Sequence, residues 1–168
     1  LSPMAEYATY NGRIPVTAAR KYGARGFGVD INPQRIAEAN ANAKAAGVTD
    51  KVEFRRQDLF ETKISDATVL TMYLLPSVNM KLRPRVLSEL KPGTRVVSHA
   101  FDMEDWKPDE EALVDGANVY LWIVPADVQG RWKVTGGQAG EMTLDLTQRF
   151  QELSGTVTIG DETRQIRD

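Results

Sequence analysis

The sequence predicts an α/β fold in which a doubly wound, mostly parallel sheet is followed by a C-terminal antiparallel β-rich extension. Three observations support this prediction. Helix-like segments alternate with short apolar runs between residues 13 and 101, and strands separated by such helices form parallel βαβ units. Beyond residue 130 the helical period is absent, and residues alternate as in half-buried strands. A chain of 168 residues suits one domain with a small appendage.

The composition excludes several kinds of functional site. The chain has no cysteine, which rules out disulfides, thiolate chemistry and cysteine-built metal sites. The chain has a single histidine, His99, so a histidine-rich metal site is excluded and we expect no metal site. The same scarcity of histidine argues against a Ser/His/Asp hydrolase. The net charge of -2 shows no bias toward nucleic acid, and no apolar run approaches the ~20 residues that span a bilayer. We therefore expect a soluble protein, either cytoplasmic or exported after removal of a leader.

Helix ends are marked by characteristic residues in the first part of the chain. One helix is expected over residues 13–22, with Gly23 as its stop. Asn32 and Pro33 have the pattern of an N-cap followed by proline at the first helical position, and they predict a second helix that ends near residue 46. A third helix is expected over residues 78–90. The strands between these helices are expected at residues 26–31, 52–55, 67–74 and 94–101.

The last third of the chain is expected to consist mostly of strands. Residues 102–116 are acidic and interrupted by Pro108, so a loop or a poor helix is expected there. The change of pattern divides the chain into residues 1–125 and 126–168. Two or three antiparallel strands are marginally stable alone, so the second domain is expected to be incomplete or to pack on the first. Its strands, and the one before it, are expected at residues 118–124, 131–134, 141–150 and 157–159, with a bulge or bend near Gly155.

Four predicted strand ends could hold a ligand, because doubly wound sheets bind ligands beyond the carboxyl ends of their strands. These positions are Asp30, Gln57-Asp58, Tyr73–Pro76 and Phe101-Asp102. The carboxylate of Asp30 is placed to accept hydrogen bonds from both hydroxyls of a ribose. Asp30 could instead cap the helix that begins near Pro33, which Asn32 could do equally well.

Asp58, which follows the next strand, suggests a second contact. Its carboxylate can accept from an exocyclic adenine amine, while the backbone N–H of Leu59 can donate to a ring nitrogen. Asp58 considered alone is more simply an ordinary residue of a strand-to-helix turn. Asp30 and Asp58 at neighbouring strand ends together indicate a ribose site beside an adenine site.

Longer stretches around these two acids resemble a known family. Residues 29–33, the helix around residues 39–43, and residues 57–60 resemble the post-I to motif III region of class I S-adenosylmethionine-dependent methyltransferases, whose sheet is Rossmann-like. Residues 71–76 and 90–98 resemble the motif IV and V region of the same family.

A more specific resemblance is to bacterial relatives of the ATP-synthase c-subunit lysine methyltransferases. These proteins share a Leu-Leu-Pro element, here residues 74–76, and a Trp-x-Pro element, here residues 106–108. The likeness covers residues 12 to about 125, and a β-rich tail also follows in the bacterial members. It implies that S-adenosyl-L-methionine is the cofactor, S-adenosyl-L-homocysteine the product, and a nucleophilic group the methyl acceptor. Protein lysine is the first expectation for the acceptor and a small molecule the second, with no nucleic acid indicated.

The resemblance also implies roles for individual residues. Tyr73 is expected to position the acceptor. The residues expected to bind the cofactor are Gly12, Asp30, Ile31, Asp58, Leu59 and Tyr73. The residues expected to bind the acceptor are Leu75, Pro76, Asp102 and Trp106. Methyl transfer from a sulfonium is an in-line displacement that needs mainly positioning and a deprotonated acceptor, so apolar and aromatic groups with one hydroxyl can suffice.

The sequence departs from the family between its first strand and first helix. Family members carry an acidic residue followed by a glycine-rich loop that approaches the methionine portion of the cofactor. Of the corresponding residues 6–13 only Gly12 and Arg13 match without strain, and Ala8 and Tyr10 stand where glycines belong. Either the first strand and glycine loop are missing across a gap near residue 10, or the protein is a degenerate methyltransferase with Tyr10 in the cofactor's space. We favour the gap, because a parallel sheet without its central strand would leave its neighbours unpaired.

Two other functions compete with methyl transfer. A nicotinamide-dependent dehydrogenase would also use Asp30, but it requires a Gly-x-Gly-x-x-Gly loop that this chain lacks, and it leaves Asp58 unexplained. The second competing function is that of a non-catalytic binding protein descended from a methyltransferase. We expect His99 to be a core histidine and the acidic residues 102–111 to be solvated rather than metal-binding.

Overall fold

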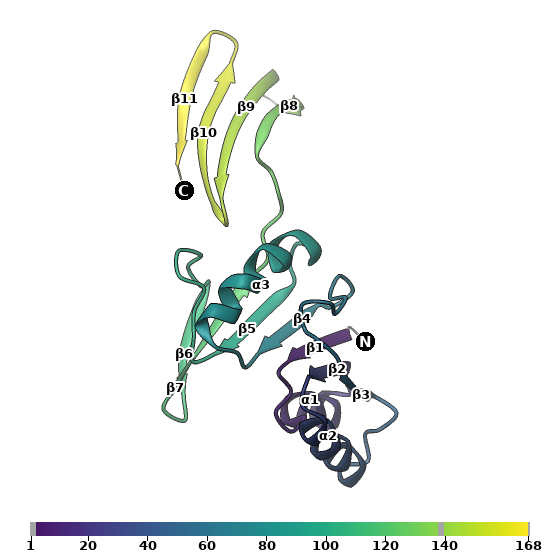
Figure 1. Cartoon of the computed structure of the whole chain (residues 1–168). Coiled ribbons are helices and arrows are strands. Elements are labelled where there is room, and N and C mark those ends of the chain that lie inside the picture. The colour runs from purple at the N-terminus through teal and green to yellow at the C-terminus, as the bar shows by residue number, and fades with distance from the viewer. Residues whose placement is uncertain (1–2, 138–139, 168) are drawn as a thin grey trace. The chain divides into compact units, whose positions relative to one another are not determined.

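The computed structural model describes residues 3–137 and 140–167, and the chain divides into two compact units, Leu1–Val124 and Pro125–Asp168 (Figure 1). Each unit is built around one sheet, of seven strands in the first and four in the second. Among the described residues, every helix is too short or too polar to traverse a lipid bilayer.

The sheet of the first unit has the strand order β3-β2-β1-β4-β5-β7-β6. β7 is antiparallel to both β5 and β6, and the other pairs are parallel. This confirms the predicted doubly wound, mostly parallel sheet. Its elements are β1 (Pro3–Tyr7), α1 (Arg13–Tyr22), β2 (Arg25–Asp30), α2 (Pro33–Ala45), β3 (Val52–Arg56), β4 (Val69–Met72), α3 (Pro76–Glu89), β5 (Arg95–His99), β6 (Glu110–Val114) and β7 (Ala117–Ile123).

β1 occupies the centre of this sheet, so the expectation that the first strand is missing was wrong. It pairs with β2 on one side and with β4 on the other. β1 contains neither Val nor Ile, yet its Ala5 and Tyr7 are completely buried. Two glycines of β2 make room for β1 and for the segment that follows it. A Cβ at Gly26 would lie 2.5 Å from the carbonyl oxygen of Met4 in β1, and one at Gly28 would lie 2.6 Å from Oγ1 of Thr9, just after β1. β1, whose side chains differ in size, therefore fits the central position because the neighbouring strand β2 has glycines where it comes close.

The helices follow the predicted end signals. α1 ends at Gly23, and α2 begins at Pro33 after Asn32, whose side chain accepts from the Gln34 N–H at 2.9 Å. α1 and α2 pack on the β1–β3 part of the sheet through a core of small and apolar residues, while α3 runs beside β4 and β5 (Figure 1). The members of that core are Ala19, Ala39, Ala43, Val48, Val52 and Phe54.

The acidic segment after β5 contains a strand where a loop or poor helix was expected. β6 forms a hairpin with β7 through Asp115 and Gly116, whose φ values of 49° and 80° suit a tight two-residue turn. All five β6 residues are exposed, so no buried face produces the alternating pattern by which a strand is recognised.

The second unit is an antiparallel sheet with strand order β11-β10-β9-β8, which confirms the predicted β-rich extension. The strands are β8 (Gly130–Gly137), β9 (Gly140–Arg149), β10 (Glu152–Ile159) and β11 (Glu162–Arg167), of which β11 was not expected. The irregularity expected near Gly155 is a close approach of two strands: a Cβ there would lie 1.9 Å from the Asp145 carbonyl oxygen.

Candidate functional site

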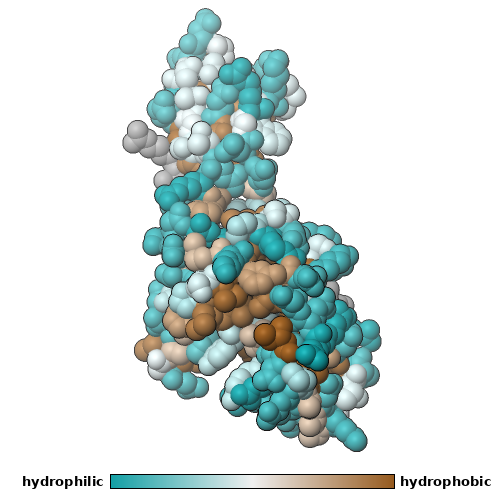
Figure 2. Space-filling view, viewed as in Figure 1, coloured by the Kyte–Doolittle hydropathy of each residue, from teal (hydrophilic) through white to brown (hydrophobic). Residues whose placement is uncertain are grey.

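Two cavities open at the carboxyl edge of the first unit's sheet. The first, of about 380 Å³, is lined by residues that end or follow β2, β3 and β4. The second, of about 460 Å³, is lined by residues after β1, by the end of β5 and by the turn of the β6–β7 hairpin. Ala8 and Tyr73 line both cavities, so the two adjoin. Figure 2 shows apolar side chains gathered on the face of this unit between α3 and the α1–α2 pair.

Asp30 ends β2 and borders the first cavity. Its Oδ1 accepts from the Asn32 N–H at 2.8 Å, which fixes the carboxylate in a tight turn. Asn32, not Asp30, caps α2, so the helix-cap explanation of Asp30 does not hold. Because only Oδ1 of the carboxylate is used in this turn, Oδ2 can accept a hydrogen bond from a hydroxyl group of a ligand.

Asp58 follows β3 and borders the same cavity, together with Leu59 and Ile31. Its Oδ1 accepts from the Phe60 N–H at 2.8 Å. The Thr62 hydroxyl donates to the Asp58 carbonyl oxygen at 2.7 Å and closes the turn. The predicted ribose and adenine residues thus line one cavity from neighbouring strands.

Arg85 of α3 holds this turn in place. Its guanidinium donates to the carbonyl oxygens of Leu59 at 3.1 Å and Thr62 at 2.9 Å. Glu89, one turn along α3, accepts from the same guanidinium at 2.6 and 2.8 Å and fixes its orientation. The edge of the first cavity is therefore anchored to a helix rather than left as a mobile loop.

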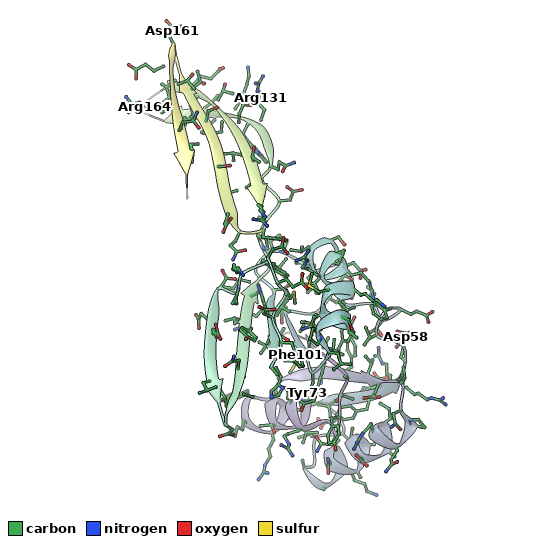
Figure 3. The ribbon with its side chains drawn as sticks, turned by 60° about the vertical axis from the view of Figure 1, so that its left-hand side comes forward. Asp58, Tyr73, Phe101, Arg131, Asp161 and Arg164 are labelled. Atoms are coloured by element: carbon green, nitrogen blue, oxygen red, sulfur yellow. The ribbon has the colours of Figure 1, made fainter. Side chains whose placement is uncertain are left out.

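Tyr73 and His99 form the wall of the second cavity. Their rings stack with centroids 4.6 Å apart and planes inclined by 27°. Tyr73 and Phe101 lie just after the neighbouring strands β4 and β5 (Figure 3). His99 was expected in the core, but it is only half-buried and faces the cavity. It was missed because the strand was predicted to continue to residue 101, whereas β5 ends at His99 and so brings it to the ligand edge of the sheet.

Glu6, near the end of β1, is a second residue that the sequence did not single out. It is buried, accepts a hydrogen bond from the Thr9 hydroxyl and borders the second cavity. Burial raises the pKa of Glu6 to about 7; the Thr9 hydrogen bond opposes this rise and the Asp30 carboxylate adds to it. The signal for it is its place at the acidic position that precedes the family's glycine-rich loop.

Comparisons with known proteins identify the family of this chain. A family model of the ANTKMT methyltransferase domain matches residues 11–110. The chain belongs to this family. It is 45% identical over 119 residues to a protein-lysine N-methyltransferase of Saccharolobus islandicus, covering 68% of this chain and 74% of that protein. It is 34% identical over 128 residues to the adenine nucleotide translocase lysine N-methyltransferase of Mus musculus, covering 76% of this chain and 54% of that protein.

A solved structure supports the same conclusion. The RNA methyltransferase from Salinibacter ruber, in complex with S-adenosyl-L-homocysteine, has 51% sequence identity and a TM-score of 0.73, covering 76% of this chain and 83% of that one. The protein is therefore an S-adenosylmethionine-dependent methyltransferase, and the comparisons favour this function over the dehydrogenase and the non-catalytic protein. When bound, the cofactor supplies a methyl group on a sulfonium centre.

The loop that departs from the family pattern leaves both cavities of the methyltransferase open. Ala8 has a φ of 56°, in the left-handed region that a glycine would favour. The Tyr10 ring, expected to fill the cofactor's space, lies 3.6 Å from the Arg35 guanidinium on α2 and is 55% exposed. It borders the second cavity instead of filling it, so the residues present fit a bound cofactor.

Four predicted site residues of the methyltransferase do not line either cavity. Trp106 is fully buried and its carbonyl oxygen accepts from Trp122 Nε1 at 2.8 Å, so it covers the sheet instead of walling an acceptor pocket. Gly12 is needed for packing, because a Cβ there would lie 2.5 Å from Phe54 Cζ.

The other two are Pro76 and Asp102. Pro76 begins α3, where proline's fixed φ suits the first turn. Asp102 is exposed and accepts from the Glu104 N–H at 3.1 Å. Local backbone geometry explains both residues without an acceptor.

Proposed function

We propose that this methyltransferase transfers methyl groups to lysine side chains of proteins. The observation that carries the proposal is the lining of the second cavity: aromatic Tyr10, Tyr73 and His99 beside the carboxyl groups of Glu6 and Asp115. A lysine side chain combines an apolar stem with a cationic end. Aromatic faces suit the stem, and both aromatic faces and acids suit the ammonium group.

We assign the first cavity to the adenosine part of the cofactor. Asp30 accepts from the ribose hydroxyls, Asp58 accepts from the adenine amine, and the Leu59 N–H donates to the ring. Ile31 and Leu75, both exposed apolar residues of this cavity, pack against the base. In this assignment Leu75 contacts the cofactor, whereas from the sequence we expected it to bind the acceptor. Tyr73, at the junction of the cavities, separates cofactor from acceptor and positions both.

The lysine amine must lose a proton before it attacks the methyl carbon, because its ordinary pKa is about 10.4. Glu6 and His99 both border the second cavity, and Glu6, whose pKa burial raises to about 7, can accept this proton. We assign them to the acceptor site, with Tyr73 holding the His99 ring in place by stacking.

Two relatives are named as lysine N-methyltransferases, which supports protein lysine, whereas the Salinibacter ruber neighbour is named as an RNA methyltransferase. The net charge of -2 and the cavity's two acids, Glu6 and Asp115, which outnumber its arginine, Arg13, favour a cationic acceptor over a phosphate backbone.

The test is incubation of the protein with methyl-labelled S-adenosylmethionine and either a histone mixture or total tRNA. We expect label in histones, located on lysine by mass spectrometry, and much less label with Asp30→Ala when S-adenosylmethionine is limiting. Label in tRNA alone would refute the lysine proposal.

A further inference from the structure

β6 is the outermost strand of the first unit's sheet, and all its residues are exposed. In a hairpin with a two-residue turn the flanking residues, here Val114 and Ala117, form a hydrogen-bonded pair, and such pairs alternate along the strands. Glu111 and Leu113 therefore direct their N–H and C=O groups away from β7. Among the described residues no strand pairs with that side of β6.

This edge leads directly into the proposed acceptor cavity. β6 runs parallel to β5, and its last residue, Val114, lines the second cavity together with Asp115 of the turn. On the sheet face that carries His99, the row of β6 side chains is Glu110, Ala112 and Val114. A chain paired with β6 would thus reach the second cavity on the side that Val114 and Asp115 line.

The charge of the edge is complementary to a basic chain. Glu110, Glu111 and Asp115 are all exposed and distributed from the start of β6 to the cavity. Among the described residues no group of three or more acids or histidines is arranged to hold a metal ion, so metal binding does not explain this acidity. Charged residues on an edge also discourage pairing between copies, but that task does not require them to continue into the cavity.

We propose that β6 is the docking strand for an extended, basic segment of the protein acceptor, which adds to the sheet edge and places a lysine in the second cavity. Backbone hydrogen bonds along an edge supply affinity, and charge complementarity supplies selectivity for basic sequences. The inference rests on the proposed lysine methyltransferase activity.

A charge-reversal pair of variants tests the electrostatic half of this proposal. With poly-L-lysine as the acceptor, Glu111→Lys should raise KM for the polymer about fivefold, as expected for reversing an exposed charge pair. Its Kd for S-adenosylhomocysteine, measured by calorimetry, should not change. The matched control is Asp50→Lys, an exposed acid just before β3 at the opposite edge of the sheet, which should leave KM unchanged.

A backbone variant tests the strand-pairing half. Leu113→Pro removes an outward N–H without removing a bond to β7, and proline is tolerated on edge strands. It should raise KM for poly-L-lysine several-fold while circular dichroism and cofactor binding remain those of the wild type. Leu113→Thr, which keeps the N–H and loses the apolar side chain, is its control and should retain a wild-type KM.

The possible results distinguish failure of the docking strand from failure of the proposed lysine methyltransferase activity. Absence of lysine methylation in both histones and poly-L-lysine would refute the proposed function. Methylation of poly-L-lysine with a wild-type KM in both Glu111→Lys and Leu113→Pro would overturn the docking strand alone. A wild-type KM together with dimer formation by Glu111→Lys in analytical ultracentrifugation would assign the edge charges to preventing self-pairing, which also overturns it.

Discussion

Asp30 shows how far a single residue could be interpreted from the sequence. Its place after a buried strand predicted a position at the ligand edge, and the structure puts it on the wall of a cavity with Asp58. His99 and Glu6 were missed because their surroundings are set by distant segments: the stacked ring of Tyr73 and the buried end of the central strand. Local sequence carries little information about such tertiary neighbours.

Replacement of Asp30 tests the ribose contact. Asp30→Ala should weaken S-adenosylhomocysteine binding by about 1.5–3 kcal/mol, the usual cost of losing hydrogen bonds to a charged group. Calorimetric titration measures the change. The control is Asn32→Ala, which removes the α2 cap and should cost about 1 kcal/mol of stability with a smaller effect on binding. An unchanged affinity in Asp30→Ala would refute the ribose contact.

Glu6 should make the stability of the protein depend on pH. Its pKa is raised from 4.5 to about 7 in the folded state, so the folded protein binds more protons than the unfolded chain between these values. The free energy of unfolding should therefore fall as pH rises through this window, by up to about 3 kcal/mol, and level off above it.

Comparison with Glu6→Gln isolates this contribution from the other titrating groups. Urea unfolding at the two ends of the window should show the wild type losing stability relative to the variant, because the glutamine cannot ionise. Parallel pH profiles for the two proteins would contradict the assignment. Glutamine retains an acceptor for the Thr9 hydroxyl, so the variant should fold.

The helices were predictable because their ends carry local signals, whereas two strands of the first unit, β1 and β6, were not. Asn32, Pro33 and Gly23 act within their own turns, and the structure has helices at those places. β1 was missed because its fit depends on Gly26 of the neighbouring strand. β6 was missed because an exposed edge strand has no apolar alternation.

α3 contributes a positioning residue for the cofactor through Arg85. Arg85→Lys should weaken S-adenosylhomocysteine binding about tenfold, because a lysine cannot bridge the Leu59 and Thr62 carbonyls and the turn must then be ordered on binding. Hydrogen exchange should become faster at the Leu59 and Phe60 amides while the sheet amides stay protected.

Arg83 provides the matched control on the same helix. It donates to the Met103 carbonyl oxygen at 3.0 Å, away from the first cavity. Arg83→Lys should lower stability without changing the Kd for S-adenosylhomocysteine. An equal loss of binding in both variants would mean that α3 acts only through general stability.

At the scale of the whole molecule, the fold class was predictable because it depends on the order of elements rather than on single contacts. The alternation of helix and strand predicted the parallel sheet, and its disappearance predicted the antiparallel extension. The fourth strand of the second unit, β11, was not expected because Glu162–Arg167 is polar and carries charged residues along an edge.

The two units should differ in what they contribute to cofactor binding. Every described residue that lines the two cavities lies before residue 120, and the first unit has its own core around Trp106 and Trp122. Backbone bonds between Val124 and the segment at Gly93 and Thr94 close the end of β7, at 2.8 and 2.9 Å. A chain ending at Ala126 keeps these bonds, so it should fold and bind S-adenosylhomocysteine with a Kd within about twofold of the full chain. Circular dichroism checks the fold and calorimetry the affinity; a folded fragment without measurable binding would show that the four-stranded unit takes part in the cofactor site.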